Sequence, residues 1–293
     1  MTYQHSQKRT LNESYVQNIY KLQEEETLLA EEKSLYLKMY FSSQIPLDVT
    51  FDRAAKSVMA GYRRLASLHD CSRLLLDEKA ALCHVLSERF PSAPVLTKPF
   101  LSQVQSARIV LWGMHTISFV GFENFKKLFS TVEQVLAESF SDVCDLVANS
   151  PDFFGIIPIE NTIDGRLSSF YKMLDRNELK ICAICDVEDP YTDTVTRVAL
   201  VCKALCSFDG DFTRYLEFSL VTEDAQKKAE FLRMAETLAG SVDRVSSTPL
   251  SYRTNVSIDT VKLSITKTNA FPFLIYLHLF CEDINILGFY IQM

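Results

Sequence analysis

The first third of the chain has the spacing of apolar residues that is typical of amphipathic helices. Between Leu11 and Phe41 there is no proline or glycine, and apolar residues recur at steps of three, four and seven. This pattern predicts one long helix of about 45 Å, at 1.5 Å per residue. Pro46 ends the pattern, Thr50 can cap a second helix that runs to about Leu68, and a third helix is predicted from Ser72 to Arg89. We therefore expect a helical unit at residues 1–90.

A cluster of prolines follows the third predicted helix. Pro91, Pro94 and Pro99 fall within nine residues, and each removes a backbone donor that a helix needs. We therefore predict a linker at residues 91–107 and a domain boundary there.

The pattern changes beyond this linker, where short β-branched and aromatic runs alternate with helical stretches. Such alternation is typical of an α/β domain, which we place at residues 108–206. The predicted strands are Ile117–Val120, Phe154–Ile159, Leu179–Asp186 and Arg197–Lys203, and the predicted helices are Ser141–Asn149 and Arg166–Asp175.

The last 80 or so residues follow the order β-α-β-β-α-β, which is the ferredoxin-like arrangement. Asp209 and Gly210 form a turn before this segment, which we place at residues 211–293. The fold class is thus α+β with several domains. The predicted strands are Tyr215–Val221, Val242–Ser246, Asp259–Ile265 and Ile284–Ile291, and the predicted helices are Asp224–Ala239 and Phe271–Cys281.

Composition and charge exclude several classes of function. Apolar residues make up 47% and charged residues 23% of the chain, as in ordinary globular proteins. There are only 8 glycines, and neither a Walker loop nor a dinucleotide-binding fingerprint is present. The net charge of -7 repels a phosphate backbone. We therefore expect no nucleotide cofactor and no nucleic-acid partner.

Hydropathy gives an expectation about location. No segment reaches the roughly 20 apolar residues that span a bilayer, and residues 1–10 are polar. We expect a cytoplasmic protein without a membrane partner, whose eight cysteines are reduced thiols.

Four of these cysteines have a spacing that invites comparison with zinc sites. Cys182 and Cys185 form one pair, and Cys202 and Cys206 form another. Both pairs lie in or beside apolar strands without the turn residues of a zinc knuckle, and residues i and i+3 of a strand face opposite sides. We therefore predict no metal site and no cofactor.

A polar group stands at the junction between a predicted strand and the next helix. Glu160, Asn161 and Thr162 directly follow the apolar run that ends at Ile159, shortly before Gly165. Ligands of open α/β sheets bind at the carboxyl ends of strands, where helix N-termini favour anions. This group is well placed to hold a small carboxylic acid, although the same residues can also serve only to cap the next helix.

The same stretch resembles the signature of the prephenate dehydratase family, Pro-Ile-Glu-Asn-Ser/Thr followed by Gly, which it reproduces as Pro158–Thr162 and Gly165. Upstream, the segments Phe140–Val143 and Phe153–Gly155 resemble the helix and strand that lead into that signature. Downstream, Thr194–Val198 resembles the Thr-Arg-Phe motif of the family, with Val198 in place of the aromatic residue.

The resemblance implies a function and a set of site residues. The family converts prephenate to phenylpyruvate, water and CO2 in L-phenylalanine biosynthesis. By resemblance, Thr196 would contact the leaving hydroxyl, Arg197 would act electrostatically, and Glu160, Asn161 and Thr162 would bind and orient the substrate. The implied ligand is therefore a small aromatic-pathway carboxylic acid, either prephenate or a phenylalanine-like compound.

Both ends of the chain resemble domains that accompany this activity. The C-terminal segment looks like an ACT regulatory domain, ending in Ile286–Tyr290, and the three N-terminal helices are laid out like a chorismate mutase domain. Lys38 matches a lysine of such mutases, but the predicted first helix contains no arginine and Ala54-Ala55 replaces an Arg-Glu pair. We expect no mutase activity, and we expect a homodimer.

Two departures from the family leave the function open. Only eight residues separate Val187 from Thr196, where the family inserts a second lobe that closes over the substrate, so we predict a single lobe. The Gly-Pro-x-Gly-Thr-Phe-Ser loop of the family is also absent after Val120. One hypothesis is a prephenate dehydratase, and the other is a non-catalytic regulator or interaction protein in which Arg197 pairs with Glu160 or Asp193.

Overall fold

The computed structural model describes residues 2–67, 74–91, 100–102, 105–150, 152–163, 165–189, 194–208, 210, 212–222, 225–249, 257–265, 270–281 and 284–293. Within these ranges it does not describe the side chains of residues 2–15, 74, 75, 100–102, 166, 168, 171, 207, 222, 248 and 249. The chain divides into two compact units, residues 1–93 and residues 94–293. In the described ranges, no helix is both long enough and apolar enough to cross a membrane.

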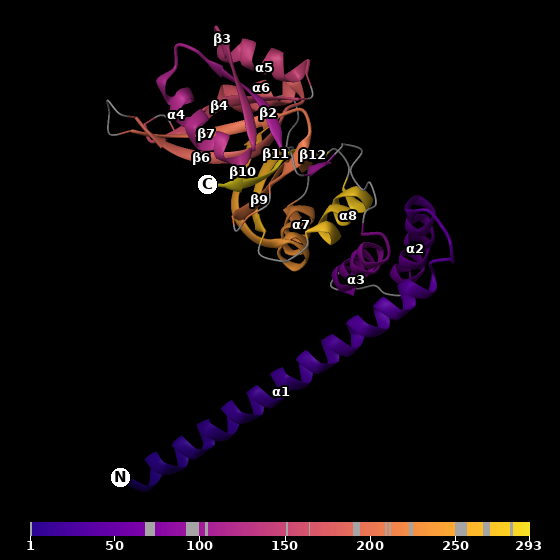
Figure 1. Ribbon diagram of the computed structural model, residues 1–293. Coiled ribbons are helices and arrows are strands. Elements are labelled where there is room, and N and C mark those ends of the chain that lie inside the picture. The colour runs from indigo at the N-terminus through magenta and orange to yellow at the C-terminus, as the bar shows by residue number, and fades with distance from the viewer. Residues whose placement is uncertain are drawn as a thin grey trace. The chain divides into compact units, whose positions relative to one another are not determined.

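The first unit consists of the three predicted helices, which are α1 (Thr2–Ser43), α2 (Phe51–Ala66) and α3 (Leu74–Arg89) (Figure 1). Its core forms where apolar residues of the three helices meet, at Phe41, Val58 and Leu82, which are all fully buried. The helix α1 begins earlier than expected and includes Arg9. The statement that the first helix contains no arginine is therefore wrong, because polar residues without proline or glycine extend the helix towards the N-terminus.

The second unit is built on a ten-stranded mixed sheet with helices packed on it (Figure 1). A separate parallel pair joins β1 (Phe100–Ser102) to β8 (Leu205–Ser207), so β1 and the start of β2 lie inside the segment predicted as a linker. The large sheet has the order β10-β11-β9-β12-β6-β7-β4-β2-β3, with β5 paired to β4. Its strands are β2 (Ser106–Trp112), β3 (Thr131–Ala137), β4 (Phe153–Asn161), β5 (Gly165–Arg166), β6 (Lys180–Glu188), β7 (Val195–Cys202), β9 (Thr213–Thr222), β10 (Gly240–Pro249), β11 (Ser257–Ile265) and β12 (Ile284–Gln292).

The segment 108–206 contains the helices α4 (Thr116–Phe125), α5 (Phe140–Ala148) and α6 (Ser168–Asn177), with a short 3₁₀ turn at Lys126–Leu128. The predicted strand Ile117–Val120 is wrong, since these residues belong to α4. Its buried residues, Ser118, Gly121, Phe122 and Phe125, recur at helical spacing, and this spacing outweighs the strand preference of four consecutive residues.

The strand directions also differ from expectation. β2 pairs in parallel with both β3 and β4, but β7 lies antiparallel between β4 and β6 in the interior of the sheet. From the sequence we expect Thr196 and Arg197 near Asn161 and Thr162 at one edge of a parallel sheet. They do lie beside Asn161 and Thr162, but on an antiparallel strand inside a mixed sheet, so the expected edge position is wrong. The link between β6 and β7 is only residues 189–194, which is too short for a crossover that would keep the strands parallel.

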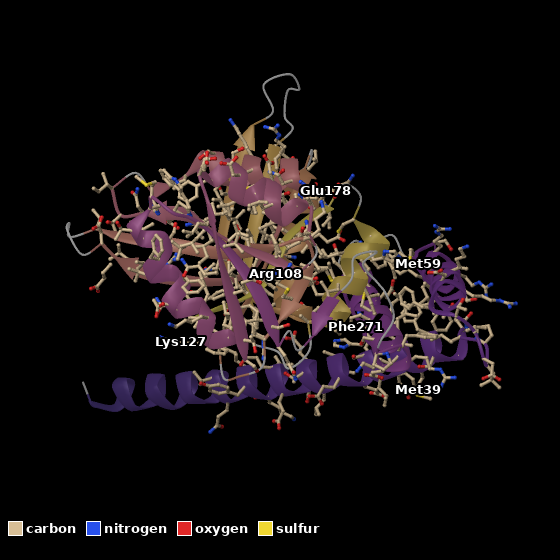
Figure 2. All side chains as sticks on the ribbon, turned by 45° about the horizontal axis from the view of Figure 1, so that its top comes forward. Met39, Met59, Arg108, Lys127, Glu178 and Phe271 are labelled. Atoms are coloured by element: carbon tan, nitrogen blue, oxygen red, sulfur yellow. The ribbon has the colours of Figure 1, made fainter. Side chains whose placement is uncertain are left out.

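The strands β2, β3 and β4 are connected by contacts of the charged side chain of Arg108. Arg108 of β2 donates from Nε to Glu133 Oε2 of β3 at 2.9 Å, and its guanidinium lies 5.6 Å from the ring centre of Phe153 on β4. Figure 2 shows Arg108 on the sheet and Lys127 just after α4. These contacts are partly exposed, so they fix register more than they add stability.

The C-terminal segment has the predicted βαββαβ order, with α7 (Ala225–Leu238) and α8 (Phe271–Phe280) as its helices. Its four strands have the spatial order β10-β11-β9-β12, with antiparallel pairing throughout. Phe218 of β9, Phe231 of α7 and Phe273 of α8 form one aromatic cluster, with ring centres 5.3 to 6.0 Å apart. This cluster is the core between the four strands and their two helices.

Within the second unit, the segment 108–206 and the C-terminal segment 211–293 share the large sheet through one strand pair. β12 pairs in parallel with β6, with Gly288 opposite Ile181. Lys180, which is only 2% exposed, donates from Nζ to Asn285 Oδ1 at 3.0 Å and also bonds to the carbonyl oxygen of Ile286. The junction is therefore a close backbone contact supported by a buried ammonium group.

Candidate functional site

The strand directions bring several chain segments to one side of the sheet. β2 is parallel to β4, and β4 and β6 both run opposite to β7, so the carboxyl ends of β2, β4 and β6 point the same way. Ligands of α/β sheets bind at this side. The side chains at this side belong to Trp112, to Glu160–Thr162 and to Glu188–Asp189.

The two sequence motifs predicted to form the site are brought into contact by the pairing of β4 with β7. Glu160 lies opposite Arg197, and Asn161 lies opposite Thr196. The strand pairing ends at Thr162, whose backbone N–H donates to the Val195 carbonyl at 3.1 Å. The five predicted site residues are thus neighbours on β4 and β7, with Glu160 and Arg197 on one face of the sheet and Asn161 and Thr196 on the other.

Asn161 and Thr162 shape the chain where β4 ends. Asn161 Oδ1 accepts from the N–H of Ile163 at 3.0 Å, and Thr162 Oγ1 accepts from the N–H of Val195 at 3.2 Å. The N-cap of α6 is Leu167, which makes no side-chain capping bond. The alternative that these polar residues cap the following helix is therefore wrong, since they stabilise the turn and attach it to β7.

Arg197 is held by two carboxylates. Its Nε and Nη2 donate to the two oxygens of Asp186 at 2.7 and 3.0 Å, and its Nη1 lies 3.6 Å from Glu160 Oε2. The hydrogen bonds with Asp186 are the main reason that the pKa of Arg197 is raised. The expected pairing with Glu160 is thus present, Asp186 is the stronger partner, and Asp193 lies outside the described residues.

Glu160 has a second cationic partner in the C-terminal part. Arg244 of β10 places Nη1 3.6 Å from Glu160 Oε1. Both side chains are partly exposed, at 42% and 29%. The carboxylate of Glu160 therefore lies between two guanidinium groups, and β10 reaches the end of β4.

Thr196 is the most buried of the predicted site residues, at 6% exposure. It stands between Asn161 on one neighbouring strand and Val187 on the other. A hydroxyl in such surroundings is held in place by its strand and is shielded from bulk water. These properties suit a group that donates one directed hydrogen bond.

An aromatic group that we did not predict lies where β2 ends and α4 begins. The rings of Trp112 and His115 stack with centres 5.4 Å apart, and Phe140 contacts both at 5.0 Å. His115 Nδ1 lies 2.9 Å from Ser118 Oγ. The apolar run Ile109–Trp112 followed by Gly113 was the sequence signal for this strand end.

Burial controls the charge of His115. Desolvation lowers its pKa, and the nearby carboxylate of Asp189 at the end of β6 opposes this effect only in part. The imidazole is therefore neutral at pH 7, and it is connected electrostatically with the end of β6.

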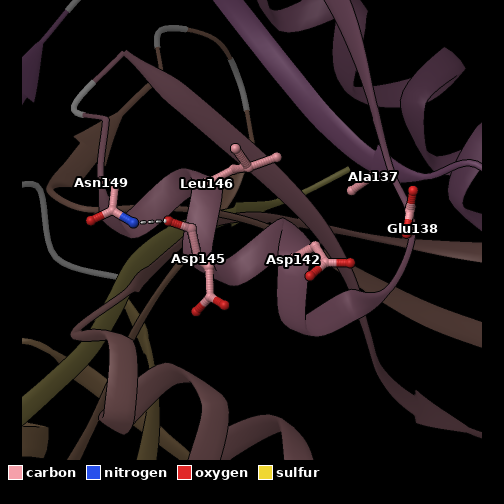
Figure 3. Close-up of a pocket in the computed structure, with 6 residues that line it drawn as sticks. All are labelled: Ala137, Glu138, Asp142, Asp145, Leu146 and Asn149. Atoms are coloured by element: carbon pink, nitrogen blue, oxygen red, sulfur yellow. Dashed lines mark hydrogen bonds between the residues drawn. The ribbon is translucent and has the colours of Figure 1, made fainter.

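A shallow depression beside α5 has a different character (Figure 3). Its volume is about 450 Å³. Carboxylates dominate its polar lining, so it would repel a dianionic ligand. We therefore do not assign the predicted carboxylic acid to it. The lining residues are Ala137, Glu138, Asp142, Asp145, Leu146 and Asn149.

One segment of the second unit matches a known protein family. Residues 121–188 match the family model described as prephenate dehydratase. This match includes the Pro158–Thr162 signature and ends before Thr196 and Arg197. No curated protein matches the sequence.

Solved structures show a related fold. The prephenate dehydratase from Streptococcus mutans has a TM-score of 0.50 at 14% identity, covering 64% of this chain and 98% of the other. The prephenate dehydratase from Staphylococcus aureus subsp. aureus Mu50 has a TM-score of 0.45 at 12% identity, covering 63% and 99%. GqqA, described as a novel type of quorum quenching acylase, has a TM-score of 0.47 at 16% identity, covering 64% and 95%.

The family model carries the assignment, and the likeness to the Streptococcus mutans structure agrees with it at the level of the fold. The signature stands at the end of β4, next to the strand that carries Thr196 and Arg197. Residues 121–188 are therefore similar to the prephenate dehydratase family.

Proposed function

We propose that the chain binds prephenate at the carboxyl ends of β2, β4 and β6 and converts it to phenylpyruvate. The observation that carries this proposal is the pairing of Asn161 with Thr196 and of Glu160 with Arg197 across β4 and β7. Two motifs separated by more than thirty residues in the sequence thus meet on neighbouring strands, with the pair Glu160–Arg197 on one face of the sheet and the pair Asn161–Thr196 on the other.

The reaction needs few groups from the protein. The bond between the ring and its carboxylate breaks and releases CO2, the electron pair enters the ring, and the hydroxyl on the opposite ring carbon leaves. A proton delivered to that hydroxyl makes it leave as water. The ring becomes aromatic, and the pyruvyl side chain is retained in phenylpyruvate.

Thr196 is the residue that we assign to the leaving hydroxyl. Its own hydroxyl is buried, and its strand is fixed on both sides by β4 and β6. A preorganised donor of this kind contributes on the order of 3 kcal/mol to a transition state. Asn161 and Thr162 act by holding the turn that faces it.

Arg197 and Arg244 are the cations for the substrate carboxylates in this proposal. Both are attached to Glu160, so a bound carboxylate has to compete with that side chain. A double cation site remains favourable for a dicarboxylate because each guanidinium has five donors and uses only some of them on its present partners.

The segment after β2 supports the same location. Thr116-Ile117-Ser118 stands where the Gly-Pro-x-Gly-Thr-Phe-Ser loop of the family has Thr-Phe-Ser, directly after the first parallel strand. The expected place of this loop, after Val120, lies within α4. Trp112 and His115 stand in place of the two glycines, so an aromatic surface replaces a backbone cradle.

The test is a steady-state assay of phenylpyruvate formation from prephenate. Thr196→Ala should lower kcat by about a hundredfold, Thr196→Ser should retain most of it, and Thr131→Ala on the exposed edge strand β3 should have no effect. Equal rates for the wild type, Thr196→Ala and buffer would refute the proposal.

A second candidate is a non-catalytic protein that binds an aromatic carboxylate. The observation that favours it is the pair of hydrogen bonds by which Arg197 is already bound to the carboxylate of Asp186. If Arg197 is a ligand-binding residue, Asp186→Asn should tighten prephenate binding in calorimetry. If Arg197 is only structural, the same variant should leave binding unchanged and lower stability slightly. Binding without turnover would favour this second candidate.

For the C-terminal part we propose an ACT-like regulatory role with a phenylalanine-like ligand. The strand order β10-β11-β9-β12 and the two helices on one face support this proposal. Titration with L-phenylalanine tests it, and a heat of binding that is absent with L-lysine is the expected result.

For the first unit we propose homodimer formation through α1, without mutase activity. Apolar side chains remain exposed along this helix, including Ile19 at 54%, Leu22 at 59% and Leu29 at 65%. Light scattering should give twice the mass of one chain. Ile19→Glu combined with Leu22→Glu should give the mass of one chain.

A further inference from the structure

Three buried thiols from three strands meet in the second unit. They are Cys182 of β6, Cys202 at the end of β7 and Cys206 of β8, and each is at most 1% exposed. The sulfur of Cys202 lies 3.2 Å from that of Cys182 and 3.3 Å from that of Cys206. All three sulfurs lie within 4.8 Å of one another.

The local backbone explains this convergence. The β6–β7 register shifts between Ile181 and Ala183, so Cys182 is the extra residue of a bulge, and bulges redirect side chains. The chain then reverses after Cys202 and returns as β8, which brings Cys206 to the same sulfur group. Cys185 points elsewhere and accepts a weak hydrogen bond from Asn124 Nδ2 of α4 at 3.9 Å.

The carbonyl oxygen of Ala204 is a fourth donor atom in this group. It lies 2.9 Å from the sulfur of Cys202, 3.8 Å from that of Cys206 and 4.0 Å from that of Cys182. Three sulfurs and one oxygen thus form an irregular tetrahedron. Zinc bonds of about 2.3 Å to sulfur and about 2.1 Å to oxygen correspond to edges of roughly 3.6 to 3.8 Å.

We propose that Cys182, Cys202 and Cys206 bind a thiophilic divalent cation of the Zn²⁺ class, with the Ala204 carbonyl as the fourth ligand. Soft thiolates select such ions, and the distances above require shifts of only a few tenths of an ångström in most edges. The group differs from the set of four that the sequence spacing suggested, because Cys185 is not part of it.

Charge favours a divalent over a monovalent ion. Three thiolates with a divalent cation carry one net negative charge, whereas the same thiolates with Cu⁺ carry two, and buried net charge is costly. Lys180 lies opposite Cys202 in the β6–β7 register and is itself buried. Its ammonium group supplies a positive charge on the same part of the sheet.

The role of the ion would be structural. The burial of all three sulfurs leaves no open coordination position for a substrate. The ion would attach β8 to β6 and β7, and because β8 pairs with β1 it would also fix the start of the second unit. This inference is independent of the proposed dehydratase activity.

Cd²⁺ is a suitable probe because its thiolate complexes absorb in the ultraviolet. The reduced full-length chain should bind one Cd²⁺ with a sulfur-to-metal absorption band, and Zn²⁺ should displace the ion. Cys202→Ser should bind at least a hundredfold more weakly. Cys185→Ser is the matched control and should bind like the wild type, since Cys185 is a buried cysteine of β6, the strand that carries Cys182.

Thermal unfolding of the wild type provides a measurement that does not depend on the folding of variants. Zn²⁺ at a hundred times its Kd should raise the midpoint by roughly 5 to 10 °C, and a chelator should reverse the rise. Three results would overturn the proposal: no absorption band with Cd²⁺, equal loss of binding in Cys185→Ser, or no midpoint shift with Zn²⁺.

Discussion

Replacement of Gly288 by alanine tests the contact that joins the two parts of the large sheet. A β-carbon at this position would lie 2.5 Å from the carbonyl oxygen of Ile181 and 2.7 Å from its β-carbon. Carbon–oxygen contacts between strands are normally about 3.3 Å, so β12 and β6 would have to separate by roughly 0.8 Å.

The cost of this separation follows from the pairing of the two strands. The parallel register contains Gly288 with Ile181, Ile291 with Ala183 and Gln292 with Ile184. Steric crowding in a packed core costs about 1 to 3 kcal/mol. We therefore expect Gly288→Ala to lower the free energy of unfolding by about 2 kcal/mol and the midpoint by roughly 4 to 8 °C.

Chemical denaturation and hydrogen exchange provide the assay. Exchange of backbone amides in β12, including Met293 N–H, which donates to Ile184 O at 3.0 Å, should accelerate. Gly113→Ala is the control, because the nearest atom to a β-carbon there is 3.7 Å away. If Gly288→Ala is as stable as Gly113→Ala, the shared sheet is not a close-packed junction.

Three further predictions concern single side chains. Because the pKa of His115 lies below its ordinary value of 6.5 in the folded chain, the unfolded chain takes up the proton first as pH falls. The wild type should therefore lose stability between pH 7 and pH 5, and urea unfolding of His115→Gln should show a smaller loss. Lys180→Met should lower the free energy of unfolding in urea by about 1 to 3 kcal/mol, because it removes the donor that bonds to the buried carbonyl of Ile286. A decrease below about 0.5 kcal/mol would contradict this role. Lys228→Met should cost about 3 kcal/mol, because Asp259 is fully buried and receives Lys228 Nζ at 2.8 Å, and the double variant with Asp259→Asn should recover part of the loss.

The helices and the C-terminal order were predictable because their patterns are long. Pro46 separates the first helix from the second, and the prolines between residues 90 and 100 mark the end of the third. The alternation from Tyr215 to Val221 is that of a half-buried strand. Short helices and strands were harder to predict, because a few residues do not establish a periodicity. The run Ile117–Val120 has the composition of a strand, and only its spacing to Phe122 and Phe125 indicates the helix.

The sequence indicated which residues the candidate site contains, but it did not indicate how they are arranged. The signature at Pro158–Thr162 identified Asn161 and Thr162, and the pairing with β7 brought them to Thr196. The partner of Arg197 was missed, because Asp186 is its neighbour only when β6 and β7 are antiparallel. The short link between those strands already contained that information.

The spacing of the cysteines brought Cys182, Cys202 and Cys206 into consideration, but it did not show which of the four candidate thiols meet. A bulge at Cys182 and the short strand β8 leave no clear mark in the pattern of apolar residues. Such local irregularities depend on the packing of neighbouring strands, which sequence periodicity does not describe.

The most direct test of the proposed activity is the simultaneous measurement of CO2 and phenylpyruvate from prephenate that carries an isotopic label in its ring carboxylate. At neutral pH the wild-type chain should release one labelled CO2 per phenylpyruvate, at a rate well above that in buffer and about a hundred times that of Thr196→Ala. Release at the buffer rate, or at the same rate from wild type and Thr196→Ala, would contradict the assignment of a catalytic site to the carboxyl ends of β2, β4 and β6.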